Sequence, residues 1–467
     1  MTQTIRPTTE AIQPERTKKQ KRKAFIGAIA GHLIEWYDYG VYGFVAVYVG
    51  TAFFAASTPA IALLSSFATF ALSFFMRPLG GLVFGPLGDR IGRKNTMALV
   101  MFLMSGSTFA IGLMPTYASI GIFAPALLIL ARCLQGLSAG GEIGTVTSYV
   151  AEFGGEKRRG LATSLLMTIA VSGLLLGSIV ANGLAAILGE TAMQDYGWRI
   201  PFLIAGPLGL MAAYIRSRLE DSAQFEAISS SGFQEKSPIR ACFAWSRNLL
   251  LVAFSIALLA SMFYMILTYA STYFVNTLGF SPTTRFWFIT VAGLTAACLM
   301  PLGGLLSDIY GRRPLLITTS ALTIPALWWF FSTAPGATPS SIFLPFMCCA
   351  VLFGLYSSMP YAIMTDLIPT QIRSTGISMA YNIPVAVFGG SAPFIATYLV
   401  NLTDDIRSPM YFFIGTAVLS LISSIIISPR HYQEVKVAEK NLLDRIAAHK
   451  AGDREEELSP EVTPPAK

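Results

Sequence analysis

Three ionisable side chains lie close together within the first apolar run of the sequence. The segment GHLIEWYDYGVYG, residues 31–43, contains an imidazole and two carboxylates where a bilayer would offer no water. At helical spacing such residues share one face, and a charged face turned toward lipid would cost several kcal/mol. We therefore expect this face to look into a cavity, and its members are His32, Glu35, Asp38, Tyr39 and Tyr42.

A carboxylate that is shielded from water holds its proton more tightly and can exchange it near neutral pH. This chemistry predicts proton coupling by Glu35 and Asp38, with His32 as a third candidate. The competing interpretation is a buried, hydrogen-bonded cluster that only packs helices. That alternative stays open for His32, and also for Glu142, another acid within an apolar run.

An arginine in the fourth apolar run, Arg132 within ARCLQG, offers a further chemical function. Its guanidinium is always charged and matches the geometry of a carboxylate. It therefore suits substrate recognition, or an ion pair with an acid of the first run. Gln135 lies about one helical turn further on and can share the same face. We assign both residues, with Tyr39 and Tyr42, to a predicted substrate site.

The C-terminal half of the sequence adds aromatic and amide side chains in its apolar runs. Such groups line binding sites for sugars and organic acids, although aromatic stripes at helical spacing more often pack a core. The candidates for substrate contact are Tyr269, Tyr273, Asn276 and Asn382.

The composition indicates which elements must hold these residues. Of 467 residues, 53% are hydrophobic and only 13% are charged, whereas soluble proteins carry about 25% charged residues. The apolar runs are about 20 residues long, which matches the thickness of a bilayer core. Because helices satisfy their own backbone in lipid, we predict an all-α membrane protein with about twelve transmembrane helices.

The basic residues are sorted between alternate loops of this predicted bundle. The first segment and the loops after the even-numbered spans are rich in Lys and Arg, whereas the intervening loops are nearly bare of them. The positive-inside rule then places both termini in the cytoplasm. The net charge of +7 is explained by topology and gives no reason to expect nucleic acid as a partner.

A loop motif occurs twice in the chain. GPLGDRIGRK at 85–94 aligns with GLLSDIYGRR at 304–313, and two further acid–arginine pairs share one spacing, Glu152 with Arg159 and Asp366 with Arg373. Glycines allow close helix approach, and the acid can cap a neighbouring helix N-terminus or pair with a base. The repeat predicts two similar halves, with a binding site at the midplane between them.

These loops resemble the signature loop of the major facilitator superfamily. The segments EWYDYGVYGF, MRPLGGLVFGPLGDRIGRK, ARCLQGLSAGGEIG, YGWRIPF and LLSDIYGRRP resemble the metabolite:proton symporter family within it, and the likeness covers nearly all of 24–430. The resemblance implies two six-helix halves, alternating access and a conformational latch between the halves. We assign to that latch Arg77, Gly85, Asp89, Arg90, Gly92, Arg93, Glu152, Arg159, Asp308, Gly311, Arg312, Asp366 and Arg373.

The expected organisation follows from these observations. A basic cytoplasmic segment precedes the two halves, a polar cytoplasmic loop joins them, and the tail lacks sustained heptads and is expected to be disordered. The corresponding ranges are 1–23, 24–217, 218–247, 248–428 and 429–467.

The leading functional hypothesis is a proton symporter that imports a small organic acid, a di- or tricarboxylate of the α-ketoglutarate or citrate type. Arg132 fits anion recognition, and AVFGGSAPFIATYLV resembles the α-ketoglutarate and citrate permeases. The alternative is a zwitterionic osmolyte such as proline or glycine betaine, because YDYGVYGFVA resembles that branch equally well. Proton-driven efflux and a non-transporting membrane sensor are further alternatives.

The sequence contains no P-loop, zincin or nucleophile-elbow motif. We therefore expect no enzyme activity, no cofactor and no metal site. The expected partners are the small-molecule substrate, protons and the lipid bilayer. We expect a monomer in a membrane of the bacterial inner-membrane type.

Overall fold

The computed structural model describes residues 18–54, 59–154, 158–218, 233 and 235–451, and all regular elements in these ranges are helices. The first half contains six long helices and one short one. Their bounds are α1 (Lys18–Phe53), α2 (Pro59–Ile91), α3 (Arg93–Leu113), α4 (Tyr117–Ile120), α5 (Phe123–Gly154), α6 (Arg159–Ala192) and α7 (Arg199–Ser217). A π-helical turn, Met193–Gly197, extends α6.

The second half repeats this plan with breaks in two of its helices. Its helices are α10 (Ser246–Tyr264), α11 (Ala270–Thr272), α12 (Pro282–Tyr310), α13 (Arg312–Thr333), α14 (Pro339–Leu367), α15 (Arg373–Pro384), α16 (Ala392–Thr403) and α17 (Pro409–Ile426). Two π-helical turns, Met265–Tyr269 and Tyr273–Thr277, flank α11 and continue α10. A third, Val385–Gly390, joins α15 to α16 directly after Pro384, which cannot donate to the helical ladder.

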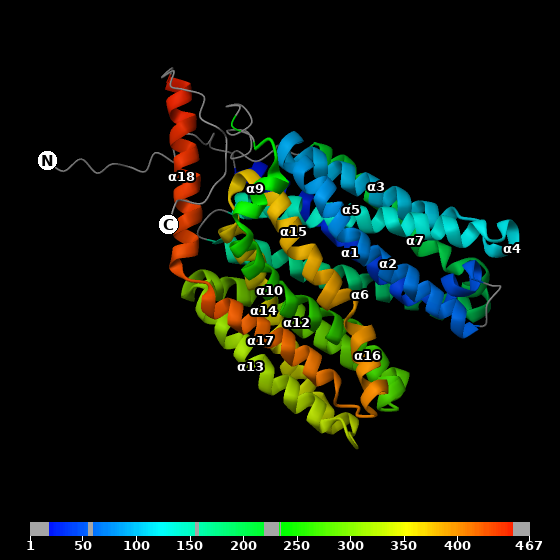
Figure 1. Ribbon diagram of the computed structural model, residues 1–467. Coiled ribbons are helices and arrows are strands. Elements are labelled where there is room, and N and C mark those ends of the chain that lie inside the picture. Colours follow the sequence, from blue (N-terminus) through cyan, green and yellow to red (C-terminus); the bar gives the residue numbers. More distant parts are fainter. Residues whose placement is uncertain (1–17, 55–58, 155–157, 219–232, 234, 452–467) are drawn as a thin grey trace.

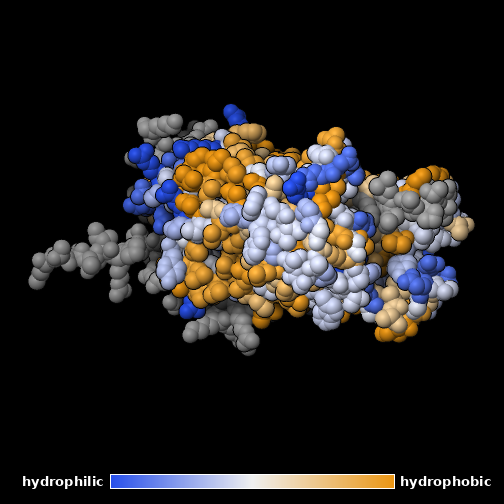
Figure 2. Space-filling model, turned by 90° about the horizontal axis from the view of Figure 1, so that it is seen from below, coloured by the Kyte–Doolittle hydropathy of each residue, from blue (hydrophilic) through white to orange (hydrophobic). Residues whose placement is uncertain are grey.

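The predicted membrane fold is confirmed. Ten helical segments among the described residues are long and apolar enough to cross a bilayer, and α1 and α2 complete the expected twelve. Large apolar side chains such as Phe102, Ile179 and Phe394 are exposed on the flanks of the bundle. Figure 2 shows hydrophobic residues over much of one flank, with hydrophilic ones gathered mainly at one end. This surface suits lipid contact.

The two halves lie side by side (Figure 1) and meet along two seams. Helix α15 packs against α2 and α5, while α6 packs against α12 and α14. Glycine makes the first seam possible, because a Cβ on Gly144 would clash with the backbone carbonyl of Ser374. A Cβ on Gly304 would likewise clash with Gly160 across the second seam.

The tail differs from the sequence prediction. Residues Pro429–Ala451 form α18, which stands at one end of the bundle (Figure 1), so the expectation of disorder from residue 429 is wrong for this segment. Its side chains Val435 and Ile446 are buried, and Glu439 accepts hydrogen bonds from Thr370 and Arg373. A helix that packs on its own bundle does not need the heptads of a coiled coil. The short helix α9 (Pro238–Ala244) lies at the same end.

Candidate functional site

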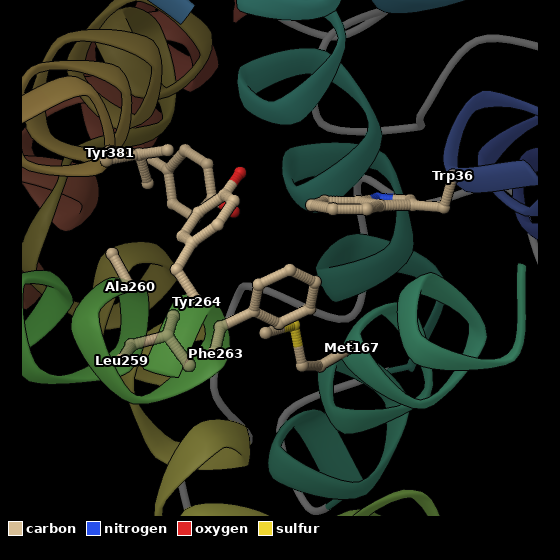
Figure 3. Close-up of a pocket in the computed structure, with 8 residues that line it drawn as sticks. Trp36, Met167, Leu259, Ala260, Phe263, Tyr264 and Tyr381 are labelled. Carbon is tan, nitrogen blue, oxygen red and sulfur yellow. The ribbon is translucent and has the colours of Figure 1, made fainter. Parts of the chain in front are cut away.

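A small cavity lies between the two halves at the centre of the bundle. Its free volume is about 10 Å³, room for about one water molecule, and its walls come from α1, α6, α10 and the α15–α16 segment. In Figure 3 the indole of Trp36 points edge-on toward the hydroxyl groups of Tyr264 and Tyr381 across this space. The lining residues are Trp36, Met167, Leu259, Ala260, Phe263, Tyr264, Tyr381 and Val385. Aromatic rings of this kind attract a methylated ammonium group by cation–π interaction, and the cavity must widen to admit one.

Arg77 of α2 lies against the aromatic wall of this cavity. Its guanidinium carbon is 4.5 Å from the ring centroid of Tyr39 and 4.6 Å from that of Phe74. The ring of Phe74 contacts Tyr264 at 5.5 Å, which connects the arginine to the cavity lining. Within the described part of the chain, Nε and Nη2 of Arg77 have no hydrogen-bond partner, although the side chain is buried. These two nitrogen atoms could receive a substrate carboxylate.

Arg77 and Asp89 were both assigned to the latch, but Arg77 contacts Tyr39 and Phe74 near the cavity. Arg77 and Asp89 are twelve positions apart on one helix, which corresponds to about 18 Å along its axis. Asp89 instead reaches the N-terminus of α15.

Asp38 lies in a second buried group, formed with α3 and α5. Gln135 Nε2 is 2.8 Å from Asp38 Oδ2 and 2.6 Å from Thr108 Oγ1. Arg132 interacts electrostatically with the Asp38 carboxylate, and its guanidinium carbon lies 3.4 Å from the ring centroid of Tyr42. All three guanidinium nitrogens of Arg132 lack a hydrogen-bond partner among the described residues. A buried carboxyl group beside a guanidinium with unpaired N–H groups can gain or lose a proton during a transport cycle.

His32 and Glu35 belong to a third buried group rather than to that of Asp38. His32 Nδ1 is 3.2 Å from Glu35 Oε2 and 3.6 Å from Glu142 Oε1. Arg216 of α7 binds the same Glu142 oxygen through Nη2 at 2.7 Å. On its other side, His32 Nε2 lies 3.2 Å from Nε1 of Trp36. The predicted acidic face of α1 is thus divided between two clusters.

His32, Glu35 and Glu142 are close enough together to bind a metal ion. One ligand atom each from His32, Glu35 and Glu142 lies within 4.8 Å of the others. Arg216 already pairs with Glu142, so a divalent ion would bring more positive charge than the remaining carboxylate, Glu35, can balance. We therefore do not interpret this cluster as a metal site.

The predicted substrate residues of the second half lie in different places. Tyr269 and Tyr273 contact each other at 5.4 Å and pack against Phe413 and Phe331 inside that half. Asn276 is exposed. Asn382 donates to the Gly140 carbonyl of the other half at 2.7 Å, so it joins α15 to α5. None of these four lines the cavity.

The latch residues form reciprocal helix caps between the halves. Asp89 of the first half accepts hydrogen bonds from Ser374 N at 3.1 Å and Thr375 N at 2.9 Å, at the start of α15. Asp308 of the second half accepts from Gly160 N and Leu161 N, both at 2.9 Å, at the start of α6. A carboxylate at a helix N-terminus is stabilised by the helix dipole and the free N–H groups. Both acids therefore act as caps, one of the two roles that the sequence left open.

Ion pairs add to these caps at the same end of the bundle. Asp366 binds Arg159 of the other half at 2.6 Å and Arg312 of its own half at 2.7 Å. Arg373 pairs with Glu439 of α18 at 2.6 Å. Arg312 also lies 3.3 Å from Asp308, which connects the ion pairs to one of the caps.

The remaining latch candidates support the tight turns and the seam. Gly92 and Gly311 adopt φ angles of 100° and 90° at the α2–α3 and α12–α13 turns, a conformation that favours glycine. A Cβ on Gly85 would approach Thr375 Cα to 2.9 Å. Arg93 donates to the Thr370 carbonyl and Arg90 to that of Lys236. The side chain of Glu152 lies outside the described residues.

Several residues of these clusters were missed by sequence reasoning. Trp36 lies between the predicted acids, and Phe263 belongs to an aromatic-rich run, so composition did not separate these two residues from packing residues. Arg216 stands near the end of an apolar run, just before a polar loop, and the sequence analysis did not single it out. The sequence did contain a signal for this buried ion pair. Arg216 lies within the end of one apolar run and Glu142 lies inside another, and charged residues in such runs usually pair with each other.

Comparisons with known proteins agree with this architecture. The Major Facilitator Superfamily model matches residues 28–390 and 287–451. The proline/betaine transporter of Salmonella typhimurium is 36% identical over 419 residues, which cover 86% of this chain and 83% of the relative. The alpha-ketoglutarate permease of Escherichia coli is 32% identical over 404 residues, which cover 86% of this chain and 92% of the relative. The citrate-proton symporter of Klebsiella pneumoniae is 31% identical over 411 residues, with coverage of 86% and 91%.

A solved structure shows the same fold at lower sequence identity. The proton:xylose symporter XylE, bound to 6-bromo-6-deoxy-D-glucose, superimposes with a TM-score of 0.74 at 16% identity, covering 88% of this chain and 95% of XylE. The predicted family is confirmed, and the expectation of a transporter rather than an enzyme is confirmed with it. The chain belongs to the major facilitator superfamily of membrane transporters.

Proposed function

We propose that this protein is a proton-coupled symporter that takes up a small zwitterion, of the proline or glycine betaine type, by alternating access. The observation that carries this proposal is the cavity between the halves, in which aromatic faces surround the space and Arg77 stands at its wall. One carboxylate and one alkylated ammonium group would match these two features.

The charge available at the cavity favours a zwitterion over a di- or tricarboxylate. Arg77 is the cation beside the aromatic wall, and the second buried arginine, Arg132, is stacked on Tyr42 next to Asp38 instead. A di- or tricarboxylate would bring two or three negative charges to one guanidinium, with Glu35 also close enough to act on Arg77. The unmatched charge would be costly in a site without water.

The sequence identities to known relatives also favour a zwitterion over an organic acid as the substrate. Identity is 36% to a proline/betaine transporter, against 32% to an alpha-ketoglutarate permease and 31% to a citrate-proton symporter. The comparisons thus support the alternative of the sequence analysis better than its leading hypothesis. An organic acid remains the second candidate, because those permeases are relatives of comparable coverage.

Asp38 is the proposed proton carrier. It is buried and is held by Gln135 beside the charge of Arg132, so either protonation state has a partner. A neutral Asp38 would leave Arg132 available for another anion, whereas an ionised Asp38 would be stabilised by it. Glu35 and His32 are proposed to take part in coupling through their own cluster.

The reciprocal caps are the proposed latch of the cycle. Asp89 and Asp308 hold the halves together at the end of the bundle where α18 lies. We propose that this end is cytoplasmic and that the protein works as a monomer in the inner membrane of a bacterium. Opening of this end would require both caps and the Asp366 ion pairs to separate.

Uptake by proteoliposomes tests the proposal. Purified protein would be reconstituted with an inward proton gradient and supplied separately with labelled glycine betaine, proline, α-ketoglutarate and citrate. We expect gradient-dependent accumulation of the zwitterions, which a protonophore abolishes. Accumulation of the acids alone would contradict the zwitterion assignment, and uptake of any substrate without response to the gradient would contradict proton coupling.

A further inference from the structure

The hydrogen bond between Trp36 and His32 joins the cavity to the cluster of buried charges. Trp36 Nε1 lies 3.2 Å from His32 Nε2, and the same indole forms a wall of the cavity, 5.1 Å from the ring of Phe263. Because an indole N–H can only donate, Nε2 of His32 is the acceptor, and the ring proton of His32 lies on Nδ1. His32 is therefore a neutral imidazole while this hydrogen bond exists.

The charges around His32 are incompletely balanced. The groups that face it are Glu35 on α1, Glu142 on α5, Arg216 on α7 and, through Glu35, Arg77 on α2. Arg216 is paired with Glu142, and it also donates to the Ala28 carbonyl. Among the described residues, the Glu35 carboxylate has only the His32 imidazole at ion-pair distance, since Arg77 acts on it from further away.

A proton on His32 would complete this cluster. An imidazolium would stand between Glu35 Oε2, at 3.2 Å, and Glu142 Oε1, at 3.6 Å. Within ion-pair distance, two carboxylates would then face two cations. The hydrogen bond from Trp36 is the structural obstacle, because a protonated Nε2 could no longer accept it.

We propose that His32, Glu35, Glu142 and Arg216 form a second proton-binding site, and that Trp36 makes its affinity for a proton depend on the occupant of the cavity. A ligand that draws the indole toward Tyr264 and Tyr381 lengthens the bond to His32 and frees Nε2 for a proton. Substrate and proton then favour each other's binding, which is the linkage that symport requires. This inference rests on the proposed function, since it takes the cavity as the substrate site.

Proton uptake on substrate binding tests the site directly. Purified protein in weakly buffered detergent solution would receive glycine betaine, with a pH indicator to count protons and calorimetry to measure binding. The wild type is expected to take up about one proton more per bound betaine than His32→Gln. His431→Gln is the matched control, because His431 is buried against Ser428 in α18, away from the cavity, and should behave as the wild type.

The Trp36→Phe variant distinguishes a role of Trp36 in proton coupling from a role in packing alone. It removes the N–H donor but keeps a ring in the wall, and protons are counted per bound betaine at saturating ligand, so that a change in affinity does not enter the comparison. His32 should then already be protonated without ligand, and the additional proton uptake should disappear. Full uptake in Trp36→Phe or in His32→Gln, with betaine still bound, would overturn the second proton site alone. Failure of the wild type to bind betaine would overturn the proposed function and this inference together.

Discussion

Gln135 Nε2 of α5 lies 2.8 Å from Asp38 Oδ2 of α1, and this contact places the buried acid beside Arg132 rather than beside His32 and Glu35. The first helix therefore carries two separate ionisable groups at different depths. Asp38 faces α3 and α5, whereas His32 and Glu35 face Glu142 and α7. The proposed division of labour can be examined by single substitutions.

Asp38→Asn should abolish accumulation of betaine driven by a proton gradient, because an amide cannot carry a proton. Exchange of external for internal betaine should persist, since exchange does not need net proton movement. Counterflow and gradient-driven uptake would be measured on the same vesicles. Asp195→Asn, an exposed acid outside the clusters, provides the control and should accumulate betaine normally. Accumulation by Asp38→Asn would assign the proton elsewhere.

The aromatic wall should be sensitive to the loss of one ring. A desolvated cation–π contact is worth about 2 kcal/mol, so Tyr264→Leu should raise the KM for betaine by about thirtyfold. Tyr264→Phe keeps the ring and should change KM by less than about threefold. Tyr411→Leu removes an exposed ring of the same half and should leave KM unchanged. If Tyr264→Leu and Tyr264→Phe raised KM equally, the hydroxyl group of Tyr264 and not its ring would be the part that binds betaine.

The two buried arginines should differ in which kinetic constant they change. Arg77→Gln removes the proposed partner of the substrate carboxylate and should raise KM by about ten- to a hundredfold, the range for a charged hydrogen bond. Arg132→Gln acts through Asp38 and should lower the maximal rate, with KM changed less. Initial rates of uptake over a range of betaine concentrations would separate these effects. The reverse pattern would exchange the roles of the two residues.

The reciprocal caps should control the opening of the end where α18 lies. Asp89→Asn and Asp308→Asn each leave one acceptor oxygen for two backbone N–H groups. Loss of one hydrogen bond costs about 0.5–1.5 kcal/mol, so each variant should shift the population toward opening by about two- to twelvefold. Distances between spin labels at residues 82 and 383, on α2 and α15, would report the change. Asp444→Asn, an exposed acid on α18, should leave the distances as in the wild type. An unchanged distribution in both cap variants would show that the ion pairs of Asp366 alone keep this end closed.

The parts of the structure that follow from local chemistry were predictable. Apolar runs gave the helices, and the repeated Gly–Asp–Gly–Arg pattern pointed to two related halves with Asp89 and Asp308 in equivalent roles. A turn glycine such as Gly92 and a cap such as Asp89 depend on neighbouring residues and backbone geometry. Sequence patterns carry that information directly.

The contacts between distant helices were harder to predict. Helical spacing placed Tyr269 and Tyr273 on one face, but it did not show that this face packs inside the second half. The π-helical turn at Met265–Tyr269 also departs from α-helical spacing, so the side chains after it point in other directions than a regular α-helix would give. Arg216 and Glu142 are far apart in sequence, so their ion pair is visible only once α5 and α7 are packed.

Proton influx driven by substrate alone is the most direct test of proton-coupled symport. Proteoliposomes with no imposed gradient and an internal pH dye would receive external glycine betaine, while parallel samples measure entry of labelled betaine. We expect the lumen to acidify as betaine enters, and we expect Asp38→Asn vesicles to exchange betaine without acidification. Entry of betaine into wild-type vesicles without acidification would contradict proton-coupled symport.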